Sequence, residues 1–213
     1  METAENIPLK ESWLKLASHY TRHQDLAEQL WQEIEQAYSS KGRYYHTLQH
    51  LNSLIKLANT HKASVQDIDS LNFAIFYHDI VYSPLRKDNE EKSAELAVAR
   101  MQRLGLSVHQ QEHICQQILA TKAHTDSPDP DTRLLLDFDL SILGNDWENY
   151  LTYTRQIRKE YSLVPYFLYR KGRKKVLQHF LALPTIYKTQ QFQDMYEHAA
   201  KQNIERELQS LLA

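Results

Sequence analysis

The sequence contains little cysteine and no long apolar run, and each shortage excludes a class of protein. The single cysteine, Cys115, cannot form an internal disulfide, and one thiolate cannot build a cysteine-rich zinc site or an iron–sulfur cluster. No apolar run approaches the roughly 18 residues that span a bilayer, and the polar start METAENIPLKES lacks the apolar core of a signal peptide. We therefore expect a cytoplasmic protein without a membrane partner.

Neither sign of charge is in large excess. The sequence has 25 Lys and Arg residues and 27 Asp and Glu residues, which gives a formal net charge of -2 at pH 7. A chain with this balance has no overall attraction to a polyanion, so nucleic acid is not an expected partner. The composition leaves open whether the protein is a monomer or an oligomer.

Glycine is also scarce, with 4 Gly and 6 Pro, and no strand-like segments alternate between turn signals. Apolar residues instead recur every three or four positions, as in amphipathic helices. We expect helices over residues 25–39, 45–60, 65–79, 88–104, 107–121, 134–143, 147–161, 176–183 and 190–212, with breaks near Gly42, Pro165, Gly172 and Pro184. Ser107 is expected to cap one helix, and Asp88 with Glu91 another. Because no segment resembles a linker, the predicted fold is a single all-α helical bundle over residues 1–213.

Several side chains that bind metal ions lie in or beside apolar segments. They are His46 and His50 in RYYHTLQH, the pair His78 and Asp79 in FAIFYHDIVY, and Asp139 in LLLDFDLSILG. An unpaired charge among apolar side chains is costly, so an Asp in such a place usually has a cation or a donor network around it. Imidazole nitrogen and carboxylate oxygen suit Zn, Mn, Fe and Ni. The pattern therefore predicts one buried metal site.

The two histidines of HTLQH are four residues apart, which would place them on one face of a helix. A zincin protease needs Glu directly after the first His of HExxH, and Thr47 stands there instead. A metalloprotease is therefore not expected.

The order H…HD…D resembles the HD superfamily of metal-dependent phosphohydrolases, helical proteins that hydrolyse phosphate esters, often of nucleotides. The segments DNEEKSAELA, TKAH, DFDLSILG, IRKEY and GRKKVL are similar to one predicted-hydrolase subfamily within it. The resemblance implies an HD domain. It also implies one or two divalent ions (Mn, Fe, Zn, Ni, Co or Mg), with His50, His78, Asp79 and Asp139 as ligands.

The segment YHTLQH is also similar to the YHNxxHA segment of cyclic-nucleotide phosphodiesterases, in which the first His donates a proton and the second binds metal. That likeness implies His46 as general acid, although Leu51 stands where the pattern ends in Ala. The implied reaction is attack of a metal-bound water on the phosphorus of a small phosphorylated substrate, possibly a nucleotide or nucleoside monophosphate.

Other polar residues are candidates for supporting roles. Glu90 is expected to face inward and to orient the attacking water, whereas Arg43, Lys122 and Arg158 could contact phosphate. His124 is expected to touch substrate or to act as a further metal ligand. Asp137 should lie on a different helix face from Asp139, and the basic run 170–175 is interpreted as a solvated helix start.

Two other classes of function stay open at this point. One is a nucleotide-binding regulatory module of the same fold that binds without turnover. The other is a di-iron oxygenase, which some HD relatives are. Phosphate release, iron content and oxygen consumption distinguish the three.

Overall fold

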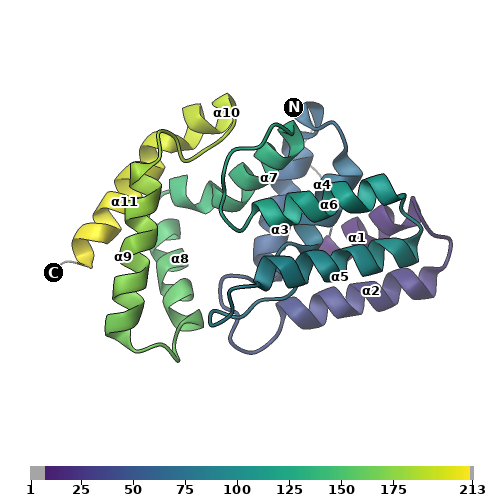
Figure 1. The fold of residues 1–213 in the computed structure, drawn as a ribbon, viewed down its shortest axis with the longest axis horizontal. Coiled ribbons are helices and arrows are strands. Elements are labelled where there is room, and N and C mark those ends of the chain that lie inside the picture. The colour runs from purple at the N-terminus through teal and green to yellow at the C-terminus, as the bar shows by residue number, and fades with distance from the viewer. Residues whose placement is uncertain (1–7, 212–213) are drawn as a thin grey trace. The chain divides into compact units, whose positions relative to one another are not determined.

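The computed structural model describes residues 8–211. Within this range every regular element is a helix (Figure 1), which confirms the all-α class. The chain divides after Leu135 into two compact units. This division leaves the expected single domain of residues 1–213 a prediction. Across residues 8–211, no helix combines the length and apolar character needed to cross a bilayer.

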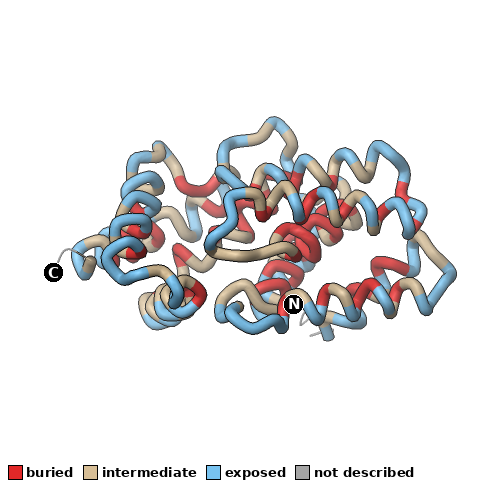
Figure 2. The backbone as a smooth tube through the Cα atoms, turned by 60° about the horizontal axis from the view of Figure 1, so that its bottom comes forward, coloured by how far each residue is buried: buried red, intermediate tan, exposed pale blue. Residues whose placement is uncertain are grey.

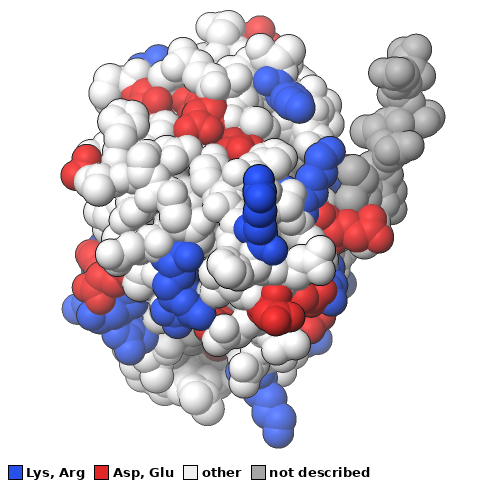
Figure 3. Space-filling view, turned by 90° about the vertical axis from the view of Figure 1, so that its right-hand side faces the viewer, with Lys and Arg blue, Asp and Glu red and all other residues white. Residues whose placement is uncertain are grey.

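Helices build the first unit. They are α1 (Leu9–Ser18), α2 (Gln24–Tyr38), α3 (Leu48–Thr60), a 3₁₀ turn (Lys62–Ser64), α4 (Ile68–Tyr77), α5 (Asn89–Leu104), α6 (Val108–Ala120) and the start of α7 (Pro130–Leu140). The buried residues recur along the inner side of these helices, as the red segments of Figure 2 show. Charges of both signs are interspersed on the face drawn in Figure 3, in agreement with the small net charge.

The core of the first unit is built around Trp13. Its ring is fully buried and packs edge-on against Phe73 and Phe76 of α4, with centroid separations of 5.8 and 5.3 Å. Its indole N–H donates to the carbonyl oxygen of Ala27 at 2.9 Å. A buried indole needs such a partner, so this one side chain joins α1, α2 and α4.

Turn chemistry sets the helix boundaries near α6. Gly105 ends α5 with φ 90°, a left-handed conformation that glycine adopts without steric cost. Ser107 and Gln110 then form a reciprocal capping box at the start of α6, which confirms the expected cap. The Asp88 cap is wrong, because no side-chain capping bond forms there and Asp88 instead pairs with Arg86 at 2.8 Å.

The second unit contains the end of α7, a 3₁₀ turn (Ser141–Gly144), α8 (Trp147–Glu160), α9 (Tyr166–Ala182), α10 (Gln190–Phe192), a π-helical segment (Gln193–Glu197) and α11 (His198–Ser210). A buried ion pair joins three of these helices. Arg173 donates to both carboxylate oxygens of Glu207, at 2.8 and 2.9 Å, and Tyr150 donates to the same carboxylate at 2.5 Å. Each buried charge is thereby paired, as a low-dielectric interior requires.

Three expected helices begin at other residues, and one helix was not expected. α1 was not predicted, α3 begins at Leu48 rather than at residue 45, and α7 begins at Pro130 rather than at residue 134. α9 begins at Tyr166 rather than at residue 176 and runs without a break through Gly172, because one exposed glycine weakens a helix by only about 1 kcal/mol. The basic run 170–175 therefore lies inside α9 and not at its start. The other expected helices are present with small shifts at their ends.

Candidate metal centre

His78 stands at the carboxyl end of α4, the most apolar helix of the first unit. It is 1% exposed, and its Nδ1 lies 2.8 Å from the carbonyl oxygen of Ile75. A carbonyl oxygen can only accept, so Nδ1 carries a proton, and in the neutral ring Nε2 is the acceptor. Histidines that bind metal ions are usually held in this way, with the second ring nitrogen donating to a carbonyl or carboxylate. The backbone thus presents Nε2 as a ligand atom.

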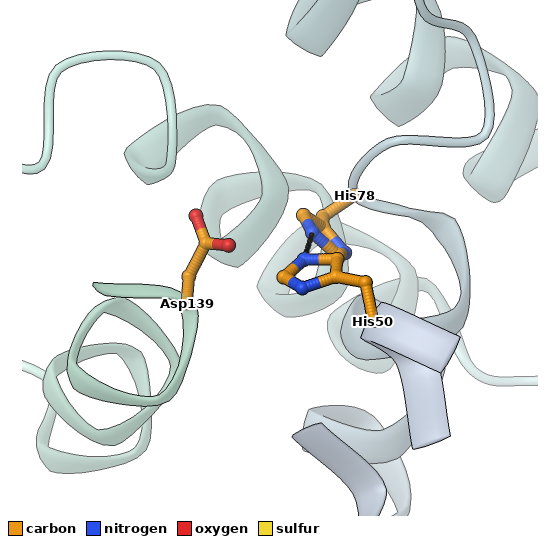
Figure 4. A group of neighbouring side chains, drawn as sticks. All are labelled: His50, His78 and Asp139. Atoms are coloured by element: carbon orange, nitrogen blue, oxygen red, sulfur yellow. Dashed lines mark hydrogen bonds between the residues drawn. The ribbon is translucent and has the colours of Figure 1, made fainter. Parts of the chain in front are cut away.

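His50 meets His78 from another helix. It lies in the first turn of α3, is 5% exposed, and its Nε2 is 3.3 Å from the Nε2 of His78, as the dashed line in Figure 4 shows. Two nitrogen ligands at about 2.0–2.1 Å from a tetrahedral ion are themselves about 3.3 Å apart. The separation of the two ring nitrogens therefore fits ligands of one ion.

Asp79 adds a carboxylate to this pair of rings. Its Oδ2 lies 3.2 Å from His78 Nε2 and 3.8 Å from His46 Nε2, and its side chain is 14% exposed. The backbone N–H of Asp79 donates to the hydroxyl of Tyr38 at 3.2 Å, a contact that the sequence did not predict. The donor set of two imidazoles and a carboxylate suits a divalent ion of the Zn, Mn or Fe type.

His46 precedes α3 instead of lying on it. The structure therefore contradicts the expected shared helix face of His46 and His50. The backbone N–H of Thr47 bonds the carbonyl of Tyr45 in a tight turn, so the chain enters the helix only at Leu48. The His46 ring packs against the ring of Tyr82 at a centroid separation of 4.2 Å. The turn still brings its Nε2 to the carboxylate of Asp79.

Arg43 joins the two sequence motifs through the backbone. Its Nη1 donates to the carbonyl oxygens of His46 and Asp79 at 3.2 and 2.7 Å, and its Nη2 donates to that of Ile80 at 2.9 Å. The guanidinium also lies over the Tyr38 ring, 4.7 Å from its centroid. Three of its five donors are thus used inside the protein. Its expected contact with substrate phosphate stays a prediction.

Two polar residues of α5 hold the segment that follows Asp79. The Asn89 side chain accepts from the backbone N–H of Ser83 at 3.1 Å and donates to its carbonyl at 2.9 Å, while Ser93 Oγ bonds both backbone groups of Val81. These two residues are four apart and buried in an otherwise apolar helix face. That spacing was the available signal in DNEEKSA, and it was missed.

The remaining expected site residues of the first unit have different surroundings. Glu90 is half-buried in the first turn of α5, between Asn89 and Ser93. Lys122 pairs with Glu91 and donates to a backbone carbonyl at 2.9 Å, and this pairing holds the pKa of Glu91 below its ordinary value. An anion would have to compete with that carboxylate for Lys122. His124 lies in the turn after α6 with φ 48°. The catalytic or binding roles of Glu90, Lys122 and His124 stay predictions.

Asp139, the third residue labelled in Figure 4, belongs to the second unit and is half-buried on α7. Asp137, two residues earlier, is fully buried and has a separate use. Its carboxylate accepts from the backbone N–H groups of Lys188 and Thr189 at 2.6 and 2.8 Å, and from the Thr189 hydroxyl at 2.6 Å. The carboxylate of Asp137 thereby fixes the segment before α10.

Comparisons with known proteins add no relative. No protein-family model matches the chain, and no curated protein or solved structure matches it.

Proposed function

We propose that this protein is a metal-dependent phosphohydrolase of the HD type, acting on a small phosphate ester, possibly a nucleotide or nucleoside monophosphate. In this proposal His50, His78, Asp79 and Asp139 hold a divalent ion. His50, His78 and Asp139 can each offer one ligand atom.

One observation carries the proposal: two buried imidazoles present their Nε2 atoms to each other at 3.3 Å, beside the carboxylate of Asp79. A pair of core histidines can be satisfied by one ring donating to the other, and His50 could donate in this way to Nε2 of His78. Asp79 distinguishes this site from such a pair, because its acid group stands 3.2 Å from Nε2 of His78, whose Nδ1 already donates to a backbone carbonyl. An unprotonated ring nitrogen and a carboxylate oxygen repel each other unless a proton or a metal ion lies between them, and the second imidazole beside them favours a metal ion.

A bound divalent ion would neutralise charge on phosphoryl oxygens and lower the pKa of water at the site. The residues of the chain supply the rest. His78 and His50 are held in place by helix ends, and Arg43 fixes the backbone on both sides of the site. His46 can hold a proton on the ring nitrogen that faces Asp79, and it would deliver that proton to the departing oxygen.

The test measures metal content and phosphate release on the same preparations. The wild-type protein, loaded with Mn²⁺ or Zn²⁺, should contain stoichiometric metal by mass spectrometry and release phosphate from at least one member of a nucleoside monophosphate panel. His78→Ala and Asp79→Ala should lose both properties while keeping the helical circular dichroism. His109→Gln is the matched control, since this histidine is exposed on α6.

Three outcomes separate the alternatives. Stoichiometric metal and full turnover in both site variants would refute the proposal. Tight nucleotide binding without phosphate release would indicate the regulatory module. Iron in the isolated protein together with oxygen consumption would indicate the oxygenase.

A further inference from the structure

The turn between α8 and α9 carries a concentration of exposed apolar side chains. Five of the ten exposed large hydrophobic residues in the described part of the chain lie between residues 163 and 176. Leu163 is 86% exposed and Phe167 is 69% exposed, so both side chains protrude. Single exposed apolar residues are ordinary on protein surfaces, but a contiguous group marks an interaction site.

Cations border this apolar group, and acids are missing from it. No Asp or Glu occurs from Tyr161 to Gln193, although the chain has 27 acidic residues. Arg173 is buried against Glu207. Within the described residues 8–211, Arg170, Lys171, Lys174 and Lys175 form no ion pair with an acid. We define the apolar–basic surface as Leu163, Tyr166, Phe167, Leu168, Arg170, Lys171, Lys174 and Lys175.

Helix geometry places both kinds of side chain on the outer face of α9. Tyr169, Arg173 and Leu177 are four residues apart and buried, so they define the inner face. Phe167, Lys171 and Lys174 are spaced by four and three residues and point the other way. Apolar and cationic side chains therefore follow one another along a single exposed face.

The protruding turn is held in one conformation. Arg158 of α8 donates from Nη1 to the carbonyl of Tyr161 at 2.5 Å and from Nη2 to that of Val164 at 3.3 Å. Its guanidinium also lies over the Tyr169 ring, 4.7 Å from the centroid. The turn that displays Leu163 is thus ordered before any partner arrives, which lowers the entropy lost on binding. Arg158 therefore has a structural use, and its expected contact with phosphate stays a prediction.

We propose that the apolar–basic surface docks on an anionic lipid bilayer. Protruding apolar and aromatic side chains enter the boundary between headgroups and acyl chains, while lysines on the same face meet the negative headgroups. The overall charge of -2 gave no reason to expect a membrane. The attraction is local, however, because screening limits each charge to a range of about 10 Å. This inference does not depend on the proposed hydrolase activity.

Charge and shape argue against two other partners. In a symmetric pair of copies the same patch faces itself, which would bring the four unpaired cations of each chain together. Nucleic acid would use the cations but leaves protruding aliphatic side chains such as Leu163 in water, since base stacking requires aromatic rings. A bilayer satisfies both the apolar and the cationic side chains.

Flotation with vesicles tests the proposal on the full chain. Wild-type protein should float with vesicles that contain about 30% phosphatidylserine and remain unbound with pure phosphatidylcholine, and raised salt should weaken the binding. Leu163→Ser with Phe167→Ser should reduce the bound fraction at least tenfold. Lys171→Gln with Lys174→Gln should do the same on anionic vesicles. All four side chains are at least partly solvent-exposed, so circular dichroism and Tm should be unchanged.

The matched control removes an exposed apolar and an exposed basic residue from the first unit. Val108→Ser with Lys56→Gln should bind vesicles as the wild type does, since Val108 is 68% exposed but has no such cationic neighbourhood on its helix. Failure of the wild type to float with anionic vesicles would overturn the proposal. So would equal flotation of the Leu163 and Phe167 variant, or retention on RNA without any vesicle binding.

Discussion

At the scale of single residues, the candidate centre depends on backbone carbonyls that position side chains. His78 is oriented by the carbonyl of Ile75, and the motifs that contain His46 and Asp79 are joined by Arg43. Sequence could identify the histidines and the acid, because their types and order carry chemical meaning. It could not identify these carbonyl contacts, since every residue has a carbonyl and only the folded chain selects one.

Arg43 gives the first prediction. Arg43→Lys should lower the affinity for Mn²⁺ about tenfold or more, because residues that orient metal ligands typically contribute that much and a lysine ammonium cannot reach three carbonyls in a planar fork. Isothermal titration calorimetry measures the affinity. Lys41→Gln, two residues earlier and exposed, is the control. An unchanged affinity in Arg43→Lys would show that the guanidinium does not position the ligands.

At the scale of helices, periodicity predicted most elements correctly, and local chemistry accounts for the errors. The Ser107 cap was readable because its partner Gln110 lies three residues away in sequence. The start of α3 was not readable, because the helix is delayed by a turn at residues 45–47 and by the bond from Arg43 to the carbonyl of His46. α7 starts at Pro130, before the expected residue 134, because Asp129 followed by Pro130 is a typical helix start. The sequence interpretation had assigned both residues to the acidic loop.

Two glycines in the second unit should respond in opposite directions to the same substitution. Gly172→Ala should raise the free energy of unfolding by about 0.5–1 kcal/mol, because the residue is helical and a Cβ there meets nothing within 4 Å. Gly144→Ala should lower it by about 1–3 kcal/mol, because the new Cβ would lie 2.6 Å from Cβ of Tyr196. Urea unfolding of the wild type and both variants measures the two changes in the free energy of unfolding. Destabilisation by Gly172→Ala would mean that α9 is interrupted there, as the sequence suggested.

The start of α7 should depend on pH through Asp129. Its carboxylate accepts from the backbone N–H and the hydroxyl of Thr132 at 2.8 and 2.5 Å and lies 3.1 Å from Nε2 of His113. Burial opposes ionisation, but hydrogen bonds from Thr132 and His113 outweigh it and hold the pKa of Asp129 below its ordinary value of 3.8. Asp129→Ala should therefore cost about 1 kcal/mol at pH 7, mostly through the lost cap.

The sign of the pH effect follows from the lowered pKa. A carboxyl that ionises more easily in the folded state stabilises the fold above its unfolded pKa, and this contribution disappears as the pH falls through the folded value. The difference between wild type and Asp129→Ala should thus be full at pH 7 and shrink below about pH 4. Urea titrations at several pH values measure it. Asp129→Asn, which keeps a capping oxygen without the charge, should show a smaller loss at pH 7, and a loss that grows on acidification would contradict the assignment.

At the scale of the whole molecule, metal binding should appear as stability. A ligand that binds only the folded state stabilises it by about 2.7 kcal/mol at a concentration of 100 times Kd, which for a chain of this length raises Tm by about 5–10 °C. Mn²⁺ or Zn²⁺ should therefore raise the Tm of the wild type, and a chelator should reverse the change. The His78→Ala variant should show no rise, because its ring nitrogen is a proposed ligand, whereas His109→Gln should behave as the wild type does. Differential scanning calorimetry with and without chelator measures each Tm. An equal rise in His78→Ala would place the stabilising ion elsewhere in the molecule, and the two facing imidazoles would then be an ordinary pair of core histidines.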